Sequence, residues 1–308
     1  PPSYQATSWQ ALAAELQSKT GAAIHLKGDG VRISLAGAQD KLSIALFADG
    51  VPRLGLGTSP STHIVKPDMR RFEGIWASAI NESLVMRTAA LCGLEAAPVF
   101  YEPTTRACVV ERFDRVVLAD GQVGRRMQYD LCQLSALPSG KKYEAEGGPS
   151  LKDCAELVRR YSTVPALDLR RLVAWVFFNV FTGNNDSHAK NLSLYSPAPG
   201  VARLTPFYDL MCTRIYPGLA QNFAFHIGGT SLPGDMERPH WVAMAEQLNL
   251  RPAFVLSTGM ALAAQLPAAL DKAVQAMAPL LAPNDAVMAE RLVQWVGRAT
   301  RQTLKRME

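Results

Sequence analysis

The chain has 308 residues, of which 48% are apolar and 19% are charged, and its formal net charge is +5. This composition excludes a globally disordered chain, because nearly half of the residues can contribute to a hydrophobic core. The length favours two domains or lobes of about 150 residues each. The positive charge is mild and forms no block of like charges, so it does not by itself require a nucleic-acid partner.

Membrane and secretion signals are the next features to consider. The apolar run 172–178 is far shorter than the about 18–20 residues of a membrane helix, and residues 1–5 do not resemble a signal peptide. The chain starts with Pro1 instead of Met, so we expect upstream residues to be missing. The five cysteines form no C-x-x-C pair, which favours reduced thiols and a cytoplasmic protein over disulfides or a zinc site. They are Cys92, Cys108, Cys132, Cys154 and Cys212.

The first 130 residues mix helical and strand patterns. Apolar residues at helical spacing predict a short helix over 9–16 and a longer helix over 77–92, which Gly93 would end. Alternating or apolar runs bounded by turn residues predict four strands. These strands are 31–35, 42–47, 63–66 and 108–111.

After about residue 130 the pattern becomes helical. Helices are predicted over 151–161 and 167–181, a short strand over 192–195, and an all-helical chain from Trp241 onward. Near the C-terminus, five apolar residues fall on one face of a predicted helix. They are Met288, Leu292, Trp295, Val296 and Ala299.

This order of elements predicts the fold class. An α/β front followed by a helical back indicates an α+β fold with two lobes and a cleft between them. We expect a mixed α/β N-lobe over residues 1–130 and a helical C-lobe over residues 131–308.

The polar segment 183–191 carries the clearest chemical signal. It contains Asp186 and Asn191, five positions apart, between an apolar helix and an apolar strand. Protein kinases place the catalytic base and a metal-binding amide at this spacing. Asp186 could accept the proton of a substrate hydroxyl, and the Asn191 amide oxygen could bind Mg²⁺, which prefers hard oxygen ligands. A solvated, turn-rich loop is the alternative explanation of this segment alone.

Three further residues would complete a set for phosphoryl transfer. Asp209 follows two aromatic residues, eighteen positions after Asn191, and could supply a second ligand to the metal. Lys66 on a predicted strand could reach ATP phosphates, and Glu82 on the next helix could hold its ammonium group. Singly, Asp209 could be a packed strand-end acid, and Lys66 and Glu82 a surface salt bridge. Their order along the chain is nevertheless that of kinases.

A run of small residues between two predicted strands is a candidate phosphate-binding loop. Residues without large side chains let backbone amides approach a phosphate closely. The signal is weak, because the run has one glycine and matches neither G-x-G-x-x-G nor the Walker A motif. The run consists of Ala36, Gly37, Ala38 and Gln39.

Together these segments resemble the HipA family, the serine/threonine-protein kinase toxins of bacterial type II toxin–antitoxin systems. The most specific matches are A-G-A-Q-D-K at 36–41, D-S-H-A-K-N at 186–191 and L-T-P-F-Y-D at 204–209. The resemblance extends from about residue 9 to the C-terminus and implies a bilobal, protein-kinase-like fold. Further matching segments are 33–35, 62–66, 110–115, 142–144 and 147–149.

The resemblance implies a role for each residue of the site. Asp186 would be the catalytic base, with His188 orienting it or contacting its backbone, and Lys66 and Glu82 would form the catalytic ion pair. Asn191 and Asp209 would hold Mg²⁺. The residues implied to contact ATP are Ala36, Gly37, Ala38, Gln39, Lys66, Met127, Gln128, Tyr129 and Asp209, with 127–130 as the hinge between the lobes.

The resemblance also implies regulation through Ser34. This residue matches the serine that the family autophosphorylates, which ejects the phosphate loop and switches the kinase off. A phosphate there would add about −1.5 to −2 charges beside a loop that holds a triphosphate, and the repulsion would disfavour ATP. Arg32 stands where short relatives of the family often carry a second serine.

The implied setting is a bacterial cytoplasm without a membrane partner. The substrate would be a translation component, an aminoacyl-tRNA synthetase in the family's precedent. The antitoxin would be a HipB-like DNA-binding protein, a separate HipS-like subdomain protein, or both, so that DNA is contacted only indirectly. Full-length HipA proteins have roughly a hundred more residues before the matching region, so the chain looks like the shorter HipT kinases. A truncated HipA is the alternative.

Two other functions are compatible with the sequence. An inactive kinase fold could bind an antitoxin and, through it, DNA, although only the basic charge favours this. The protein could also phosphorylate a small molecule or a lipid, although no basic amphipathic helix for membrane binding is evident. The residue set favours ATP- and Mg²⁺-dependent serine/threonine protein kinase activity of the non-specific class (EC 2.7.11.1).

Overall fold

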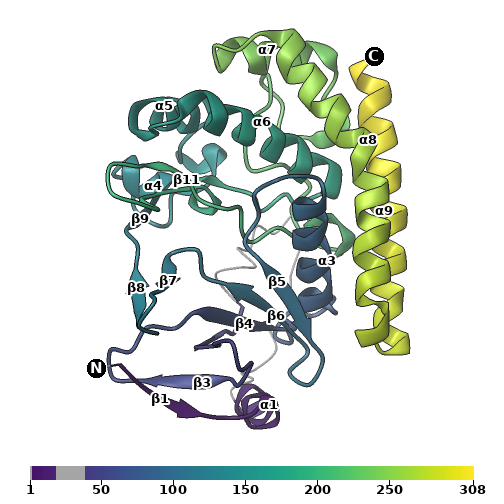
Figure 1. Cartoon of the computed structure of the whole chain (residues 1–308). Coiled ribbons are helices and arrows are strands. Elements are labelled where there is room, and N and C mark those ends of the chain that lie inside the picture. The colour runs from purple at the N-terminus through teal and green to yellow at the C-terminus, as the bar shows by residue number, and fades with distance from the viewer. Residues whose placement is uncertain (1, 19–38) are drawn as a thin grey trace.

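The fold has a strand-rich N-lobe and a helical C-lobe (Figure 1). The computed structural model describes residues 2–18 and 39–308. The predicted strand 31–35, with Arg32 and Ser34, and the predicted phosphate-loop residues Ala36, Gly37 and Ala38 lie outside the described residues.

A four-stranded antiparallel sheet forms the centre of the N-lobe. Its strands are rich in β-branched residues, which pack well on a pleated surface. Lys66 pairs in register with Cys108, so the lysine lies on a central strand. The predicted strands 63–66 and 108–111 are confirmed, while 42–47 is shorter than predicted. The strands, in sheet order, are β2 (Leu42–Ile44), β4 (His63–Pro67), β6 (Ala107–Glu111) and β5 (Val99–Glu102).

Helices cover both faces of this sheet. Helix α1 (Trp9–Ser18) places Leu12 and Leu16 in a small apolar core with residues of β2, β4 and β6. Helix α3 (Ser78–Leu91) packs against β4, β5 and β6 and carries Glu82. Almost all of α3 is buried because two C-lobe helices cover its other side. Both helices occupy the regions predicted from the apolar spacing.

Shorter strands complete the N-lobe and connect it to the C-lobe. Two antiparallel pairs, β1 with β3 and β7 with β8, lie at its edge. A second sheet has the order β11-β10-β9 and joins the lobes, and its strand β10 confirms the prediction over 192–195. The bounds are β1 (Ser3–Ala6), β3 (Arg53–Leu56), β7 (Arg115–Val117), β8 (Val123–Arg125), β9 (Gln128–Asp130), β10 (Ser193–Tyr195) and β11 (Arg203–Leu204).

The C-lobe packs around α6, whose side chains are mostly buried. The predicted helices over 151–161 and 167–181 are confirmed as α5 and α6, and the chain is helical after Trp241 as predicted. The helices are α4 (Leu131–Leu134), α5 (Leu151–Tyr161), α6 (Pro165–Thr182), α7 (Arg238–Gln247), α8 (Pro252–Met277) and α9 (Pro283–Met307). Short 3-10 turns are η1 (Glu144–Glu146), η2 (Ala189–Asn191), η3 (Thr213–Ile215), η4 (Pro233–Asp235) and η5 (Ala278–Leu280).

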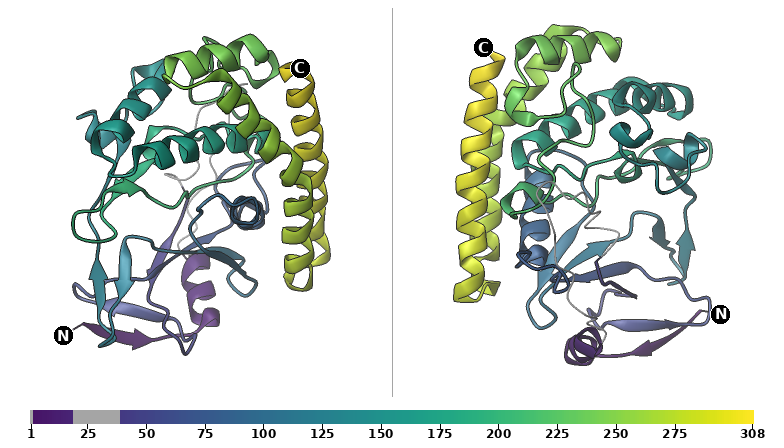
Figure 2. Two further views of the ribbon diagram at one scale, coloured as in Figure 1. Left: turned by 45° about the horizontal axis from the view of Figure 1, so that its top comes forward. Right: turned by 180° about the vertical axis from the view of Figure 1, so that it is seen from behind.

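The two C-terminal helices extend from the C-lobe along α3 (Figures 1 and 2). The uninterrupted apolar runs of the sequence are short, so they did not indicate a helix as long and as apolar as α8. The stretch Pro252–Leu280 has the length and mean hydropathy, 1.5, of a membrane span, but 44% of the apolar stretch is buried inside the fold. It packs against α3, α6, α7 and α9, so in this fold it is a core helix.

Candidate active site

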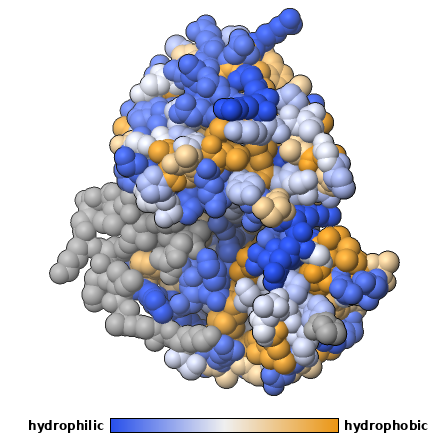
Figure 3. Space-filling view, turned by 90° about the vertical axis from the view of Figure 1, so that its left-hand side faces the viewer, coloured by the Kyte–Doolittle hydropathy of each residue, from blue (hydrophilic) through white to orange (hydrophobic). Residues whose placement is uncertain are grey.

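Five residues predicted from the sequence come together between the lobes. Lys66 lies on β4 and Glu82 on α3, whereas Asp186 and Asn191 lie between α6 and β10 and Asp209 follows β11. All five line one small cavity, together with Gln39, Asn184 and Met211. The face seen in Figure 3 is hollowed between the two lobes, and the surface there is largely hydrophilic.

Lys66 of the N-lobe forms an ion pair with the carboxylate of Asp209 in the C-lobe. Its Nζ lies 2.6 Å from Oε1 of Glu82 and also pairs with Oδ1 of Asp209. Lys66 and Glu82 are only 6% and 2% exposed, so this is not the surface salt bridge of the alternative interpretation. A buried ammonium group that is paired with two carboxylates can bind an anionic ligand only by giving up part of this pairing. Binding of phosphate groups is the role of the corresponding lysine in kinases.

Burial and mutual attraction set the charges of these three groups. Burial opposes the charge on Lys66, but Asp209 and Glu82 more than offset it and raise its pKa, so the amine stays protonated. Burial raises the pKa of the Glu82 carboxyl, although Lys66 opposes the shift. Burial acts the same way on Asp209, but there the Lys66 charge prevails and the pKa is lowered. Asp209 is therefore the carboxylate that stays ionised and available to a cation.

The backbone of Asp209 is held in the left-handed region, at φ 55°. Residues other than glycine are uncommon there, although aspartate tolerates it better than most. The strands and side chains on either side hold this geometry. Tyr208 Oη donates to the Lys190 carbonyl oxygen at 2.8 Å, and Asn184 Nδ2 donates to the Asp209 carbonyl oxygen at 3.3 Å. The strained residue thereby directs its carboxylate into the cavity.

The loop that carries Asp186 is mostly buried and is held by hydrogen bonds to neighbouring segments, which excludes the solvated-loop alternative. Helix α6 ends at Gly183 in the left-handed conformation, and the Gly183 carbonyl oxygen accepts from the backbone N–H groups of Thr213 and Arg214 at 3.0 and 3.1 Å. The Asn185 amide donates to the backbone carbonyl oxygens of residues 220 and 221. A loop fixed at both ends in this way holds its side chains in place before a ligand arrives.

Asp186 and His188 contact a residue to which the sequence assigned no role. The hydroxyl of Tyr143 donates to Oδ1 of Asp186, and its ring meets the His188 ring edge-on, with centroids 5.1 Å apart. His188 Nε2 lies 3.8 Å from Asp186 Oδ1, too far for a hydrogen bond. Burial lowers the pKa of His188 to about 3, so the ring is neutral. In the sequence, Tyr143 could have been found through the segment 142–144, which is among the segments that carry the family resemblance.

The oxygen atoms around the cavity fit a magnesium ion. Asn191 Nδ2 donates to Oδ2 of Asp209 at 3.4 Å, so the two proposed ligands are adjacent, and a turn of the Asn191 amide would present its oxygen to the ion. Asn184 Oδ1, which the sequence did not single out, is buried without a hydrogen-bond partner in the described structure, and Asn184 lines the same cavity. Amide and carboxylate oxygens are hard ligands of the kind Mg²⁺ prefers.

The protein would supply only part of the coordination shell. In residues 2–18 and 39–308, no group of three or more His, Cys, Asp or Glu side chains is placed to hold a metal ion. Mg²⁺ typically takes one or two protein carboxylates and completes its shell with phosphates and water. The donor set of Asp209, Asn191 and Asn184 matches this pattern.

The remaining predicted ATP contacts lie on either side of the cavity. Gln39 is buried and lines it, and its Nε2 donates to the Pro67 carbonyl oxygen at 2.9 Å. Met127, Gln128 and Tyr129 lie at β9, which joins the lobes, and they are not among the residues that line the carboxylate cavity. Met127 and Tyr129 are 65% and 45% exposed, so they are open to contact by an adenine bound beside this connecting strand.

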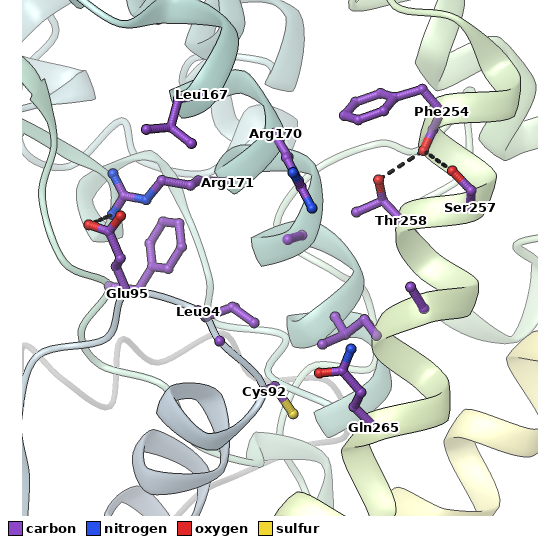
Figure 4. A pocket seen from close by; sticks show the side chains of 15 residues that line it. Cys92, Leu94, Glu95, Leu167, Arg170, Arg171, Phe254, Ser257, Thr258 and Gln265 are labelled. Atoms are coloured by element: carbon purple, nitrogen blue, oxygen red, sulfur yellow. Dashed lines mark hydrogen bonds and ion pairs between the residues drawn. The ribbon is translucent and has the colours of Figure 1, made fainter.

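A larger cavity, of about 630 Å³, lies away from the carboxylates between the end of α3, α6 and α8 (Figure 4). Several of its polar groups are paired with each other or with the backbone. Arg171 pairs with Glu95 at 3.5 Å, and the hydroxyl groups of Ser257 and Thr258 donate to the Phe254 carbonyl oxygen. None of the predicted site residues lines it. The chemistry therefore belongs to the smaller cavity between the lobes.

Comparison with known proteins shows the family of this chain. The family model described as HipA-like C-terminal domain matches residues 33–275. "Putative kinase Y4mE" of Sinorhizobium fredii is 42% identical over 226 residues, covering 72% of this chain and 52% of that protein. Serine/threonine-protein kinase toxin HipA of Shewanella oneidensis is 31% identical over 284 residues, covering 88% and 64%. The chain thus spans about half to two-thirds of the length of these relatives.

A solved structure supports the same assignment. HipA in the Shewanella oneidensis complex of HipA, HipB and operator DNA matches with a TM-score of 0.86 and 25% identity. The match covers 99% of this chain and 73% of the solved chain. By family model, sequence and structure, this chain belongs to the HipA family and has its two-lobed, kinase-like α+β fold.

Proposed function

We propose that the protein is an ATP- and Mg²⁺-dependent serine/threonine protein kinase and the toxin component of a type II toxin–antitoxin system. The observation that carries this proposal is the position of Lys66, whose amine contacts both Glu82 of the N-lobe and Asp209 of the C-lobe beside Asp186. Kinases require this lysine–glutamate pair and the metal-binding aspartate to be in place together.

The residues would divide the work of phosphoryl transfer among them. Lys66 would bind phosphate oxygens, and Asp209, Asn191 and Asn184 would hold Mg²⁺, which neutralises the phosphate charge when bound. Asp186 has 13% of its side chain exposed, so a substrate hydroxyl can reach it and give up its proton there. Tyr143 would fix the carboxylate, and Gln39 would mark the end of the phosphate loop formed by Ala36, Gly37 and Ala38.

The relatives support a proposal for the biological setting. The Shewanella oneidensis relative has been solved with HipB and operator DNA. We therefore propose a HipB-like antitoxin as a partner, with DNA contacted through it, and a separate HipS-like protein if the system is tripartite. The substrate would be an aminoacyl-tRNA synthetase in the cytoplasm. Phosphorylation of Ser34 would place negative charge beside the phosphate loop and weaken ATP binding.

Labelled ATP tests the catalytic assignment. Asp186→Asn removes the proton acceptor and Asp209→Asn removes a metal ligand, so each should reduce autophosphorylation by about 10²–10⁴ fold. Asp271→Asn is a matched control, because Asp271 is exposed on α8, far along the chain from the site. Undiminished autophosphorylation in both site variants would refute the roles assigned to Asp186 and Asp209.

Expression in bacteria tests the biological proposal. A kinase toxin should arrest growth as wild type and be harmless as Asp186→Gln, whereas a non-catalytic binding module would act alike in both forms. Comparing the phosphoproteomes of the two cultures would then identify the substrate. A dominant new site on a protein outside translation would refute the proposed substrate class while leaving kinase activity intact.

A further inference from the structure

A third cavity, of about 300 Å³, lies between Arg214 and helix α9 and gathers positive charge. Three arginines from two segments line it, and none of its lining residues is acidic. The lining residues that carry the argument are Arg214, Trp295, Arg298, Gln302 and Arg306. A pocket with only cationic charged groups favours an anionic ligand.

One wall is a row of donors along α9. Arg298, Gln302 and Arg306 follow each other at four-residue spacing, which places them side by side on one face of the helix. With a rise of 1.5 Å per residue, the row extends over about 12 Å. The Arg306 guanidinium is held by the carbonyl oxygens of Pro233 and Met236, at 3.1 and 3.4 Å, so it is positioned without being neutralised.

Arg214 faces this row from the segment that follows Asp209. Its guanidinium carbon lies 5.8 Å from the centre of the Trp295 ring. Burial and the nearby charge of Arg306 lower its pKa. In the part of the chain that the structure describes, no carboxylate lies within salt-bridge distance of Arg214, Arg298 or Arg306. Guanidinium groups gathered without a carboxylate repel each other, and a bound anion would relieve this repulsion.

The chemistry of these groups selects phosphate. Guanidinium groups form paired hydrogen bonds with phosphate oxygens, and a phosphate monoester carries about −1.5 to −2 charges, more than one carboxylate. The cavity volume is at the lower end of small-molecule sites, so a macromolecule would not fit inside. We propose that this cavity binds a small phosphorylated molecule, with its phosphate between Arg214, Arg298 and Arg306.

The cavity is linked to the catalytic loop through the backbone. The Arg214 amide donates to the Gly183 carbonyl oxygen at 3.1 Å, and Gly183 begins the loop that carries Asp186. Trp295, which lines the cavity, also packs against Gly183. A ligand here would thus contact residues that support the start of the catalytic loop. The site stands independently of the proposed kinase activity, because it is defined by binding alone.

Calorimetry with pyrophosphate tests the proposal on the full chain. Arg298→Gln should weaken pyrophosphate binding by about tenfold or more, since it removes a charge-assisted contact from an exposed side chain without disturbing the core. Arg301→Gln changes the net charge equally, on the same helix but outside the cavity lining, and should alter affinity less than about twofold.

Two results would overturn the site. One is the absence of pyrophosphate binding to the wild type, and the other is an equal loss of affinity in the Arg298→Gln and Arg301→Gln variants. Gln302→Glu provides a second variant, because a carboxylate in the arginine row should abolish binding, whereas Gln275→Glu, at an exposed position of α8 outside the cavity lining, should not. Binding at the ATP cavity would not respond to any of these changes.

Discussion

Tyr143 donates a hydrogen bond from its hydroxyl group to Oδ1 of Asp186, the proposed catalytic base. The tyrosine comes from the segment between α4 and α5 and is 5% exposed, with its ring against His188. His188 in turn donates its backbone N–H to Oδ1 of Asn191 at 3.0 Å. The base and the amide ligand are therefore held by one packed unit of side chains.

Removing the Tyr143 hydroxyl tests this orientation. Tyr143→Phe keeps the ring packing and removes this hydrogen bond to Asp186, so kcat should fall by about tenfold while KM for ATP changes little. Tyr161→Phe, at the exposed end of α5, controls for the loss of a phenol hydroxyl. Steady-state kinetics of autophosphorylation or peptide phosphorylation measures both. An unchanged kcat in Tyr143→Phe would show that Asp186 does not need this contact.

Glycine is required at position 183 for two reasons, the left-handed backbone conformation and the lack of space for a side chain. Gly200 shares only the first reason, so comparing the two positions separates the contributions. Both glycines have positive φ, 72° and 73°, but an added Cβ at Gly183 would overlap the Trp295 ring, whereas Gly200 faces open space. Gly200→Ala should therefore cost only the backbone strain, about 1–2 kcal/mol. Gly183→Ala should cost a further 1–3 kcal/mol or so through overpacking. Urea unfolding measures both, and equal losses would contradict the packing argument.

The sequence predicted those parts of the site that depend on spacing and chain order. Asp186 and Asn191 were identifiable because five positions along one loop fix their proximity, and Lys66 and Glu82 because a strand and the next helix pack together. Tyr143 was not, because its contact with Asp186 spans 43 residues and depends on how the C-lobe packs.

For the fold too, local sequence patterns do not predict what depends on tertiary packing. Helix α8 was missed as a single long element because isolated polar residues and Pro267 interrupt its apolar runs, although packing against four helices makes it part of the core. The arginine cavity was also not foreseeable, since Arg214 and Arg298 meet only through tertiary packing. Local patterns thus predicted the chemistry, whereas the supporting contacts required the structure.

A double-mutant cycle tests the buried charge cluster. Lys66→Met leaves the carboxylates of Glu82 and Asp209 uncompensated and should reduce the free energy of unfolding by about 3–5 kcal/mol. Glu82→Gln should cost less, because burial already raises the pKa of Glu82 and Lys66 still pairs with Asp209. The double variant should be more stable than Lys66→Met alone. Strictly additive losses in urea unfolding would contradict this coupling.

His63 should make the protein less stable in mild acid. Its ring lies partly buried on β4, with Nδ1 2.8 Å from the Thr62 hydroxyl oxygen, and burial lowers its pKa to about 4. Between pH 6.5 and about 4 the unfolded chain binds a proton at this position that the folded chain does not. The free energy of unfolding therefore falls as the pH falls through this window, by at most about 1.4 kcal/mol per pH unit from this residue.

Replacing the ring isolates this contribution. Glutamine does not titrate, so His63→Gln should flatten the dependence of the free energy of unfolding on pH between 6.5 and 4, while the dependence above pH 7 stays unchanged. Urea unfolding of both proteins at half-unit pH intervals measures the difference between their slopes. Parallel curves would show that His63 takes up its proton in the folded protein as readily as in the unfolded chain, against the burial seen beside Phe100.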